Sequence, residues 1–181
     1  MILIRSAEPE DAERLLEIYR PYVEETAITF EITVPTVEEF CGRIERISKY
    51  YPYLVAVESP SEDPEGGRIV GYAYADRYKS REAYDHCCET SIYLDREARG
   101  QGIGRFLYEA LEAELSEMRI LNLYACVTCP SGEPDGYADY NSSEFHEHMG
   151  YEIVGRFHGC GRKFGRWYDT LWMEKIWTSE E

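Results

Sequence analysis

Positive charge, long apolar runs and complete cysteine motifs are all scarce in this chain of 181 residues. Its 19 Lys and Arg face 35 Asp and Glu, which gives a net charge of −16. That balance argues against a protein that wraps nucleic acid or an anionic membrane. No apolar run approaches the roughly 20 residues of a membrane helix, and Arg5 follows Met1 too closely for a secretory signal. We therefore expect a cytoplasmic protein that binds neither nucleic acid nor membranes.

The six cysteines do not form a complete metal motif. In a cytoplasmic chain we expect them to be reduced thiols. Cys126 and Cys129 have the spacing of half a zinc or redox site, but no second CxxC pair exists. We expect no metal; a metal-binding module built from Cys126, Cys129, His158 and Cys160 remains an alternative.

Length and composition predict one globular domain, 1–181, with a core over about 2–177. Hydrophobic residues make up 44% of the chain and aromatic residues 14%, and the chain shows no repeat or linker. Periodicity and turn residues predict strands at 2–5, 53–57, 69–75, 90–94, 121–127, 151–157 and 168–177. Helices are expected from Pro9, from the capping box at Thr36, over 103–118 and over 142–149, and a glycine-rich loop over 159–165. This order indicates an α+β fold.

Apolar spacing also predicts the buried faces of two helices. The second helix should turn Val37, Phe40, Ile44 and Ile47 inward. The long central helix should turn Ile103, Phe106, Leu107, Ala110, Leu111, Leu115 and Met118 inward.

The strongest chemical signal is the glycine-rich turn at 99–104, between a predicted strand and the central helix. The first N–H groups of a helix lack intrahelical partners, and the helix dipole adds positive charge there, so this turn suits a phosphate or pyrophosphate. It lacks the Gly-Lys-Ser/Thr of a P-loop and the spacing of a dinucleotide fingerprint. A plain glycine turn is the structural alternative.

Arg99-xx-Gly102-x-Gly104 resembles the acetyl-CoA pyrophosphate loop of the GNAT superfamily of N-acetyltransferases. Further segments follow in that family's order: 18–19, 26–31, 51–56, 70–75, 81–84, 89–93, 145–151 and 163–169. Together they resemble the phosphinothricin/methionine-sulfone N-acetyltransferase subgroup. The resemblance runs from about Ile4 to about Lys175.

The resemblance implies the GNAT acyl-CoA N-acyltransferase fold. Its mixed central sheet splays between strands 4 and 5, here 90–94 and 121–127, and acetyl-CoA enters the split. The backbone of Ile92, Tyr93 and Leu94 would pair with the thioester and pantetheine. The N–H groups of Arg99, Gly100, Gln101, Gly102, Ile103, Gly104 and Arg105 would hold the pyrophosphate.

The resemblance also implies direct attack of an amine on the acetyl group. Glu89, which we expect at the start of the central strand, would be the general base. His146 stands where many relatives carry a Tyr that protonates the leaving thiolate; a packed helix histidine is the alternative. Relatives often have a pantetheine-contacting Asn where this chain has Asp139. Either Asn141 takes over that contact or the contact is absent.

On the acceptor side the resemblance implies Phe30, Arg81, Tyr84, Tyr93 and Lys163. Arg81 could grip a carboxylate or phosphinate bidentately, or it could be an ordinary solvated charge. The loop at 129–140 is longer than usual and borders the acceptor pocket. The acceptor therefore cannot be inherited from the subgroup.

We therefore expect an acetyl-CoA-dependent N-acetyltransferase acting on a small, amino-acid-like primary amine. Relatives commonly dimerise, and the aromatic residues Trp167, Tyr168, Trp172 and Trp177 offer apolar surface for a homodimer. A non-catalytic acyl-CoA sensor is the other alternative.

Overall fold

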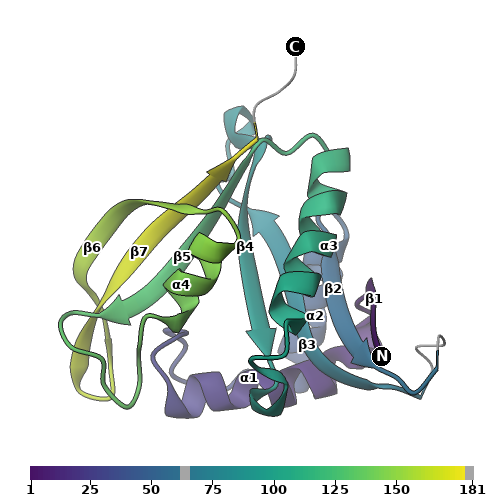
Figure 1. Cartoon of the computed structure of the whole chain (residues 1–181), viewed down its shortest axis with the longest axis horizontal. Helices are drawn as coiled ribbons and strands as arrows, with labels where there is room; N and C mark the ends of the chain where they lie inside the picture. The colour runs from purple at the N-terminus through teal and green to yellow at the C-terminus, as the bar shows by residue number, and fades with distance from the viewer. Residues whose placement is uncertain (62–65, 178–181) are drawn as a thin grey trace. The chain divides into compact units, whose positions relative to one another are not determined.

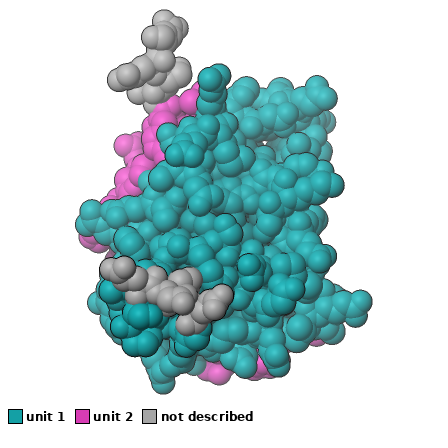
Figure 2. All heavy atoms as spheres, turned by 90° about the vertical axis from the view of Figure 1, so that its right-hand side faces the viewer, with its two compact units in different colours: residues 1–19, 35–120 teal, residues 20–34, 121–181 magenta. Residues whose placement is uncertain are grey.

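The computed structural model describes residues 1–61 and 66–177 (Figure 1). They group into two compact units, which Figure 2 colours teal and magenta. Unit 1 comprises Met1–Tyr19 and Pro35–Ile120, and unit 2 comprises Arg20–Val34 and Leu121–Glu181. The single domain expected from the sequence stays a prediction. No helix in the described ranges is both long and apolar enough to span a membrane.

Unit 1 contains four antiparallel strands in the order β1-β2-β3-β4. Their bounds are β1 Ile2–Ser6, β2 Tyr53–Glu58, β3 Arg68–Arg77 and β4 Cys87–Leu94. The predicted strands at 53–57 and 69–75 are confirmed as β2 and β3, and they pair as an antiparallel hairpin. The predicted start of β4 is wrong, because β3 pairs with β4 from Arg77 opposite Cys88 onward. Glu89 therefore lies inside the strand.

The helices of this part of the chain begin where the sequence predicts. The single turn η1, Pro9–Asp11, leads into α1, Ala12–Glu25. α2 spans Val37–Ser48, and its predicted capping box is confirmed: the Thr36 hydroxyl accepts from the N–H of Glu39, and the Glu39 carboxylate accepts from the N–H of Thr36. α3 spans Ile103–Glu117.

Three residues predicted to face inward are exposed: Val37, Phe106 and Met118. Val37 is the first residue of α2 and Met118 is the C-cap of α3, so both lie at helix ends. Phe106 lies about 120° around α3 from the centre of its buried stripe, at about 100° per residue. That stripe consists of Ile103, Leu107, Leu111 and Leu115, with Gly104 and Tyr108 beside it.

The two faces of the unit 1 sheet differ in their partners. On one face the Tyr108 hydroxyl of α3 donates to the Thr90 hydroxyl at 3.1 Å. On the other face the Tyr93 ring meets Tyr19 of α1 edge-on, with ring centres 4.9 Å apart. Because side chains alternate along a strand, Glu89 shares the tyrosine face with Tyr93.

The described residues of unit 2 contain three antiparallel strands in the order β5-β7-β6, the helix α4 and the end of α1. Their bounds are β5 Asn122–Pro130, β6 Glu152–Lys163 and β7 Arg166–Ile176, with α4 at Asn141–His148. Gly150 follows α4 with φ of 86°, the left-handed conformation typical of the glycine that ends a helix.

The predicted glycine-rich loop at 159–165 is wrong. β6 continues to Lys163, and only Phe164 and Gly165 form the turn into β7, both with positive φ. Such a pair of positive φ values matches the tight turns of hairpins. The register of β6 against β7 shifts between Phe157 and Gly161, so a bulge accommodates the remaining glycines within the strand.

Candidate active site

The glycine-rich turn leads directly into α3 and leaves the start of that helix without a side-chain cap. Gly100 and Gly102 have φ of +73° and +78°, a conformation that favours glycine. Gly102 is the N-cap and accepts the first helical hydrogen bond, from the N–H of Phe106. A Cβ at either glycine would meet nothing within 4 Å. Backbone conformation, and not crowding, therefore requires these glycines.

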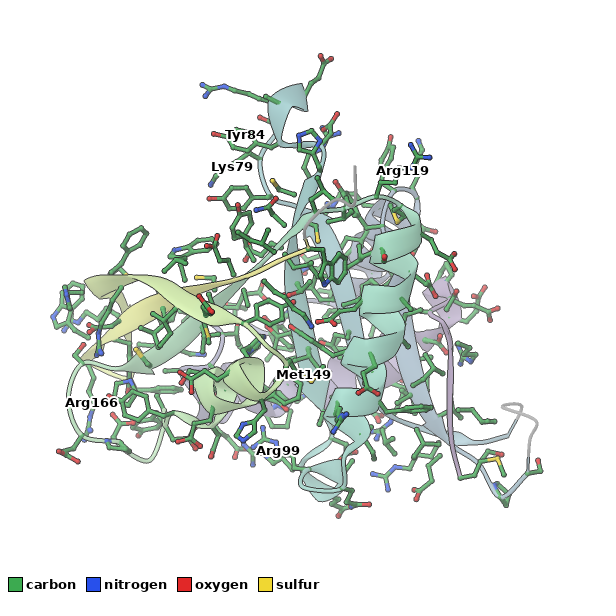
Figure 3. The ribbon with its side chains drawn as sticks, turned by 45° about the horizontal axis from the view of Figure 1, so that its top comes forward. Lys79, Tyr84, Arg99, Arg119, Met149 and Arg166 are labelled. Atoms are coloured by element: carbon green, nitrogen blue, oxygen red, sulfur yellow. The ribbon has the colours of Figure 1, made fainter. Side chains whose placement is uncertain are left out.

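The α3 start also lacks the acidic residues that the other helices place there. Of the four α-helices in the described residues, α1, α2 and α4 carry Glu in the first turn and α3 carries none. Since an acidic first turn neutralises the helix dipole, α3 retains a positive N-terminus suited to an anion. Figure 3 shows Arg99 in the preceding loop. The Arg105 guanidinium is 2.7 Å from the carboxylate of Glu109.

Asp95 holds the beginning of this loop in place. It was not among the site residues predicted from the sequence. Its carboxylate accepts from Arg14 at 2.5 Å, from Arg68 at 2.8 Å and from the N–H of Glu97 at 3.2 Å. Burial opposes its ionisation, but these hydrogen bonds outweigh burial and lower the pKa of Asp95. The glycine turn is thereby tied to α1 and β3. An acidic residue between a strand and a glycine turn is the signal that could have revealed it.

Glu89 lies half-buried on β4, directly opposite Asp76 of β3. Burial raises the pKa of Glu89; the Asp76 charge raises it further, whereas Lys79 lowers it. Among the described residues, none donates a hydrogen bond to the Glu89 carboxylate or forms an ion pair with it. Such a carboxylate has the properties of a general base.

The connection between β3 and β4 carries two of the predicted acceptor residues, Arg81 and Tyr84. Arg81 immediately precedes the single turn η2, Glu82–Tyr84, and is exposed. It forms no ion pair within 1–61 and 66–177. The Tyr84 ring meets Tyr78 edge-on, with ring centres 5.8 Å apart. Lys79 and Tyr84 are labelled in this connection in Figure 3.

Ile92, Tyr93 and Leu94 pair with β3 along one edge of β4. Within unit 1, β4 is the last strand in the order β1-β2-β3-β4. Gly71 faces Leu94 so closely that a Cβ on Gly71 would lie 2.4 Å from the Leu94 side chain. This close packing fixes the end of β4, four residues before the glycine turn.

His146 is 4% exposed on α4. Its Nδ1 lies 2.7 Å from the carbonyl oxygen of Ser142, and because a carbonyl only accepts, Nδ1 must carry the proton. Burial lowers the pKa of His146, and the Ser142 hydrogen bond only partly offsets it. At neutral pH His146 is therefore a neutral imidazole, poorly suited to donating a proton. His148 is exposed, because it lies about 200° around the helix from His146.

Asn141 and Asp139 form hydrogen bonds with each other. The Asn141 side-chain amide donates to the Asp139 carboxylate at 2.6 Å, and the Asn141 N–H donates to it at 3.0 Å. A pantetheine contact through the Asn141 amide would have to compete with this hydrogen bond.

Phe30 and Lys163 lie together in unit 2, but in different environments. Phe30 is 36% exposed, and its ring packs against Gly161. Lys163 is 5% exposed, and its ammonium donates to the carbonyl oxygen of Thr29 at 2.8 Å. These contacts count against Lys163 as a direct substrate ligand.

The long loop after β5 is fixed to β7 by Asp135. Its carboxylate accepts from the N–H groups of Tyr137 and Ala138 at 2.8 and 2.9 Å, and from Tyr168 and Arg166 at 3.0 Å each. The Tyr137 ring stacks on Phe164, with ring centres 4.2 Å apart. Hydrogen bonds and this ring contact therefore hold the loop in one conformation against β7.

All six cysteines are free thiols. Among the described residues, no three or more His, Cys, Asp and Glu side chains gather where they could hold a metal ion. The structure therefore does not bring Cys126, Cys129, His158 and Cys160 together as a ligand set.

The family model for the acetyltransferase (GNAT) domain matches residues 4–172. The chain belongs to the GNAT family of acetyltransferases. It is 32% identical to a phosphinothricin N-acetyltransferase of Streptomyces coelicolor, over 96% of this chain and 95% of that protein. It is 30% identical to an L-methionine sulfoximine/L-methionine sulfone acetyltransferase of Pseudomonas aeruginosa, over 94% of this chain and 92% of that protein.

Among solved structures, the chain is similar to a GNAT superfamily phosphinothricin acetyltransferase of Sinorhizobium meliloti in complex with AcCoA. The TM-score is 0.84 at 34% identity, covering 97% of this chain and 88% of that chain. The predicted GNAT fold, acetyltransferase activity and subgroup resemblance are confirmed. The structure places the GNAT loop residues, Glu89, Arg81 and Tyr84 in unit 1, and Phe30, Asn141, His146 and Lys163 in unit 2.

Proposed function

We propose that this GNAT protein transfers the acetyl group of acetyl-CoA to the primary amine of a small, amino-acid-like acceptor of the phosphinothricin or methionine sulfone type. The observation that carries the proposal is the start of α3: a glycine N-cap, no acidic residue in the first turn and open space in front of the turn. These features fit an anionic pyrophosphate. The names of the relatives support the acceptor class.

The residues around the glycine turn fit acetyl-CoA, which supplies an acetyl thioester when bound. The N–H groups of Arg99, Gly100, Gln101, Gly102, Ile103, Gly104 and Arg105 surround the anion position. The backbone of Ile92, Tyr93 and Leu94 offers hydrogen-bonding groups for the pantetheine and thioester. Asp95 keeps the turn in place through Arg14 and Arg68.

Glu89 takes the proton that an ammonium must lose before it can attack, directly or through one water. Its raised pKa brings it closer to the working pH, and no described residue forms a hydrogen bond or an ion pair with its carboxylate. The amine nitrogen then forms a bond to the acetyl carbon, and the thiolate leaves as the carbon–sulfur bond breaks. Positioning supplies much of the rate.

His146 is a packing and positioning group of α4 in this proposal, because burial keeps it neutral. The thiolate can then take its proton from solvent. Arg81, with no ion-pair partner among the described residues, recognises an anionic group of the acceptor. Phe30, Tyr84 and Tyr93 supply aromatic surface.

The rival function, a non-catalytic acyl-CoA sensor, is separated by one experiment. Purified protein is incubated with acetyl-CoA and a panel of amino acids, and both thiol release and acetylated product are measured. Acceptor-dependent thiol release supports the enzyme. Calorimetric binding of acetyl-CoA without any product would support the sensor.

A cytoplasmic homodimer completes the proposal. Of the four aromatic residues expected to form the contact, Trp167 is 60% exposed, whereas Tyr168 is buried, which makes it unsuitable. The exposed apolar residues of β6, Ile153, Val154 and Phe157, extend the surface instead. Light scattering of the wild type and of Phe157→Lys tests this, with a shift to monomer expected for the variant.

A further inference from the structure

The irregular segment after α1, residues 26–30, is held at successive positions by other elements of unit 2; we call it the strap. The N–H of Ala27 donates to the carbonyl oxygen of Tyr137 at 2.9 Å. The Thr128 hydroxyl donates to the carbonyl oxygen of Ile28 at 3.3 Å. Hydrogen bonds thus replace regular secondary structure in ordering the strap.

Lys163 supplies the next hydrogen bond along the strap. Its ammonium donates to the carbonyl oxygen of Thr29 at 2.8 Å and lies 3.5 Å from that of Tyr22, in the last turn of α1. The last carbonyls of a helix lack intrahelical partners and carry negative partial charge. A buried ammonium is costly unless such acceptors surround it, so burial lowers the pKa of Lys163 while Glu31 raises it.

Gly161 determines where the end of the strap lies. A Cβ at Gly161 would come within 2.2 Å of the Phe30 ring. Only glycine therefore allows this ring position. Gly161 and Lys163 are two residues apart on β6 and so face the same side of the strand. One short stretch of β6 thus fixes both Thr29 and Phe30.

We propose that Lys163 is a positioning residue for acceptor recognition: with Gly161 it fixes the strap, and the strap presents the Phe30 ring to the acceptor amine. In this role Lys163 does not touch the acceptor, whereas a direct substrate ligand would bind it through the ammonium charge. The proposal rests on the proposed function, in which Phe30 lines the acceptor site.

Lys163→Met tests the proposal, because methionine retains an apolar stem and loses the ammonium. We expect kcat/KM for the acceptor to fall about tenfold, mainly through KM, with calorimetric acetyl-CoA affinity unchanged. The loss should be equal for an amino acid and for its neutral amide. Hydrogen exchange of the amides at 27–30 should accelerate. A loss confined to the carboxylate-bearing acceptor would mean direct charge contact and overturn the proposal.

Gly161→Ala provides a variant without any change of charge and should reproduce the same loss. Gly155→Ala, on the same strand, is the matched control, since a Cβ there meets nothing within 4 Å. When Phe30 is already replaced by Ala, adding Lys163→Met should lower kcat/KM by less than a further factor of about three, because both substitutions act through the Phe30 ring. If the wild type acetylates amines but Lys163→Met stays within twofold of it, the proposal is wrong. A wild type that acetylates no amine would instead refute the proposed function.

Discussion

Glu89 combines partial burial with a carboxylate that forms no hydrogen bond or ion pair with any described residue. A structural carboxylate is normally paired when it is buried. Glu89 instead faces a second carboxylate, Asp76, across the β3–β4 ladder. At the scale of single residues, this arrangement supports the proposal that Glu89 is the general base.

Glu89→Gln should lower turnover at neutral pH by 10²–10⁴-fold, about 3–5 kcal/mol in the barrier, because the variant retains shape but cannot accept the proton. Raising the pH should restore part of the rate, since more amine then arrives deprotonated. Steady-state kinetics with acetyl-CoA check this, with Glu82→Gln, an exposed neighbour, as the control. Turnover of Glu89→Gln within about threefold of wild type would make Glu89 a bystander.

Glu89→Gln should also stabilise the fold at neutral pH. The raised pKa means that the folded state binds the Glu89 proton more tightly than the unfolded chain does. Ionisation above the ordinary value of 4.5 therefore costs folding free energy. Thermal unfolding should show the variant gaining stability over wild type from pH 4 to pH 7. A gain that shrinks over this range would contradict the raised pKa.

Arg81 should set the preference for anionic acceptors. Arg81→Ala should lower kcat/KM for an amino acid and leave that for its amide nearly unchanged, because only the acid carries the partner charge. Arg77→Ala is the control, since Arg77 in the same region already faces Asp85 at 3.6 Å. Equal use of an amino acid and its amide by the wild type would refute this role.

At the scale of elements, the proposed acetyl-CoA site lies at the start of α3. Gly102→Glu should weaken calorimetric acetyl-CoA affinity at least tenfold, about 1.4 kcal/mol, because it places a carboxylate at the anion position. Gly102→Ala measures the backbone strain alone at φ of +78°. Gly42→Glu on α2 adds the same charge elsewhere and should leave affinity unchanged. An unchanged affinity for Gly102→Glu would disprove the site.

The pairing of β3 with β4, together with a contact from α2, should set the pKa of Glu89, the proposed general base. Arg46 holds Asp76 through two hydrogen bonds, at 2.9 and 3.2 Å, and Asp76 raises the pKa of Glu89. Asp76→Asn should therefore move the acidic limb of the kcat/KM pH profile to lower pH. Arg46→Gln leaves the Asp76 charge uncompensated and should move that limb upward. Shifts in the same direction for both variants would contradict this coupling.

The sequence predicted the elements whose signals are local. The capping box at Thr36 fixed the start of α2 because both of its hydrogen bonds span three residues. The loop at 159–165 was mispredicted because glycine signals turns, whereas a bulge against β7 is set by pairing. The same limit hid Asp76, whose position opposite Glu89 depends on strand register.

For the site residues too, local signals were visible in the sequence and contacts between distant residues were not. The glycine turn was visible because its chemistry lies within six residues. The burial of Lys163 was not visible, since it depends on Thr29, more than a hundred residues away in the chain. The sequence therefore suggested that Lys163 contributes to the acceptor site, but not how.

At the scale of the whole molecule, ionised aspartates maintain the fold at neutral pH. Asp169 is buried on β7 and accepts from Ser131, Gly159 and Arg156, each within 2.7 Å. Burial opposes its ionisation, but these hydrogen bonds lower the pKa of Asp169 well below 3.8. A depressed carboxyl pKa stabilises the folded state above the unfolded value, and this stability is lost as the pH falls below it.

Asp169→Asn should therefore lower the unfolding temperature at pH 7 and should flatten its decline between pH 4 and pH 2. Thermal unfolding monitored by circular dichroism measures both. Asp139→Asn, on an exposed carboxylate, is the control. If the unfolding temperature of Asp169→Asn falls between pH 4 and pH 2 as steeply as that of the wild type, the loss of stability in acid comes from other carboxylates.

The central claim is acetyl transfer from acetyl-CoA to a small amine, and product analysis tests it most directly. The wild-type protein is incubated with acetyl-CoA and equimolar amino acids, including phosphinothricin and methionine sulfone, and products are identified by mass spectrometry alongside thiol release. We predict at least one N-acetylated amino acid in equal amount to released thiol, with both strongly reduced in Glu89→Gln. Acetyl-CoA that binds yet yields no acetylated amine with any acceptor would contradict the claim.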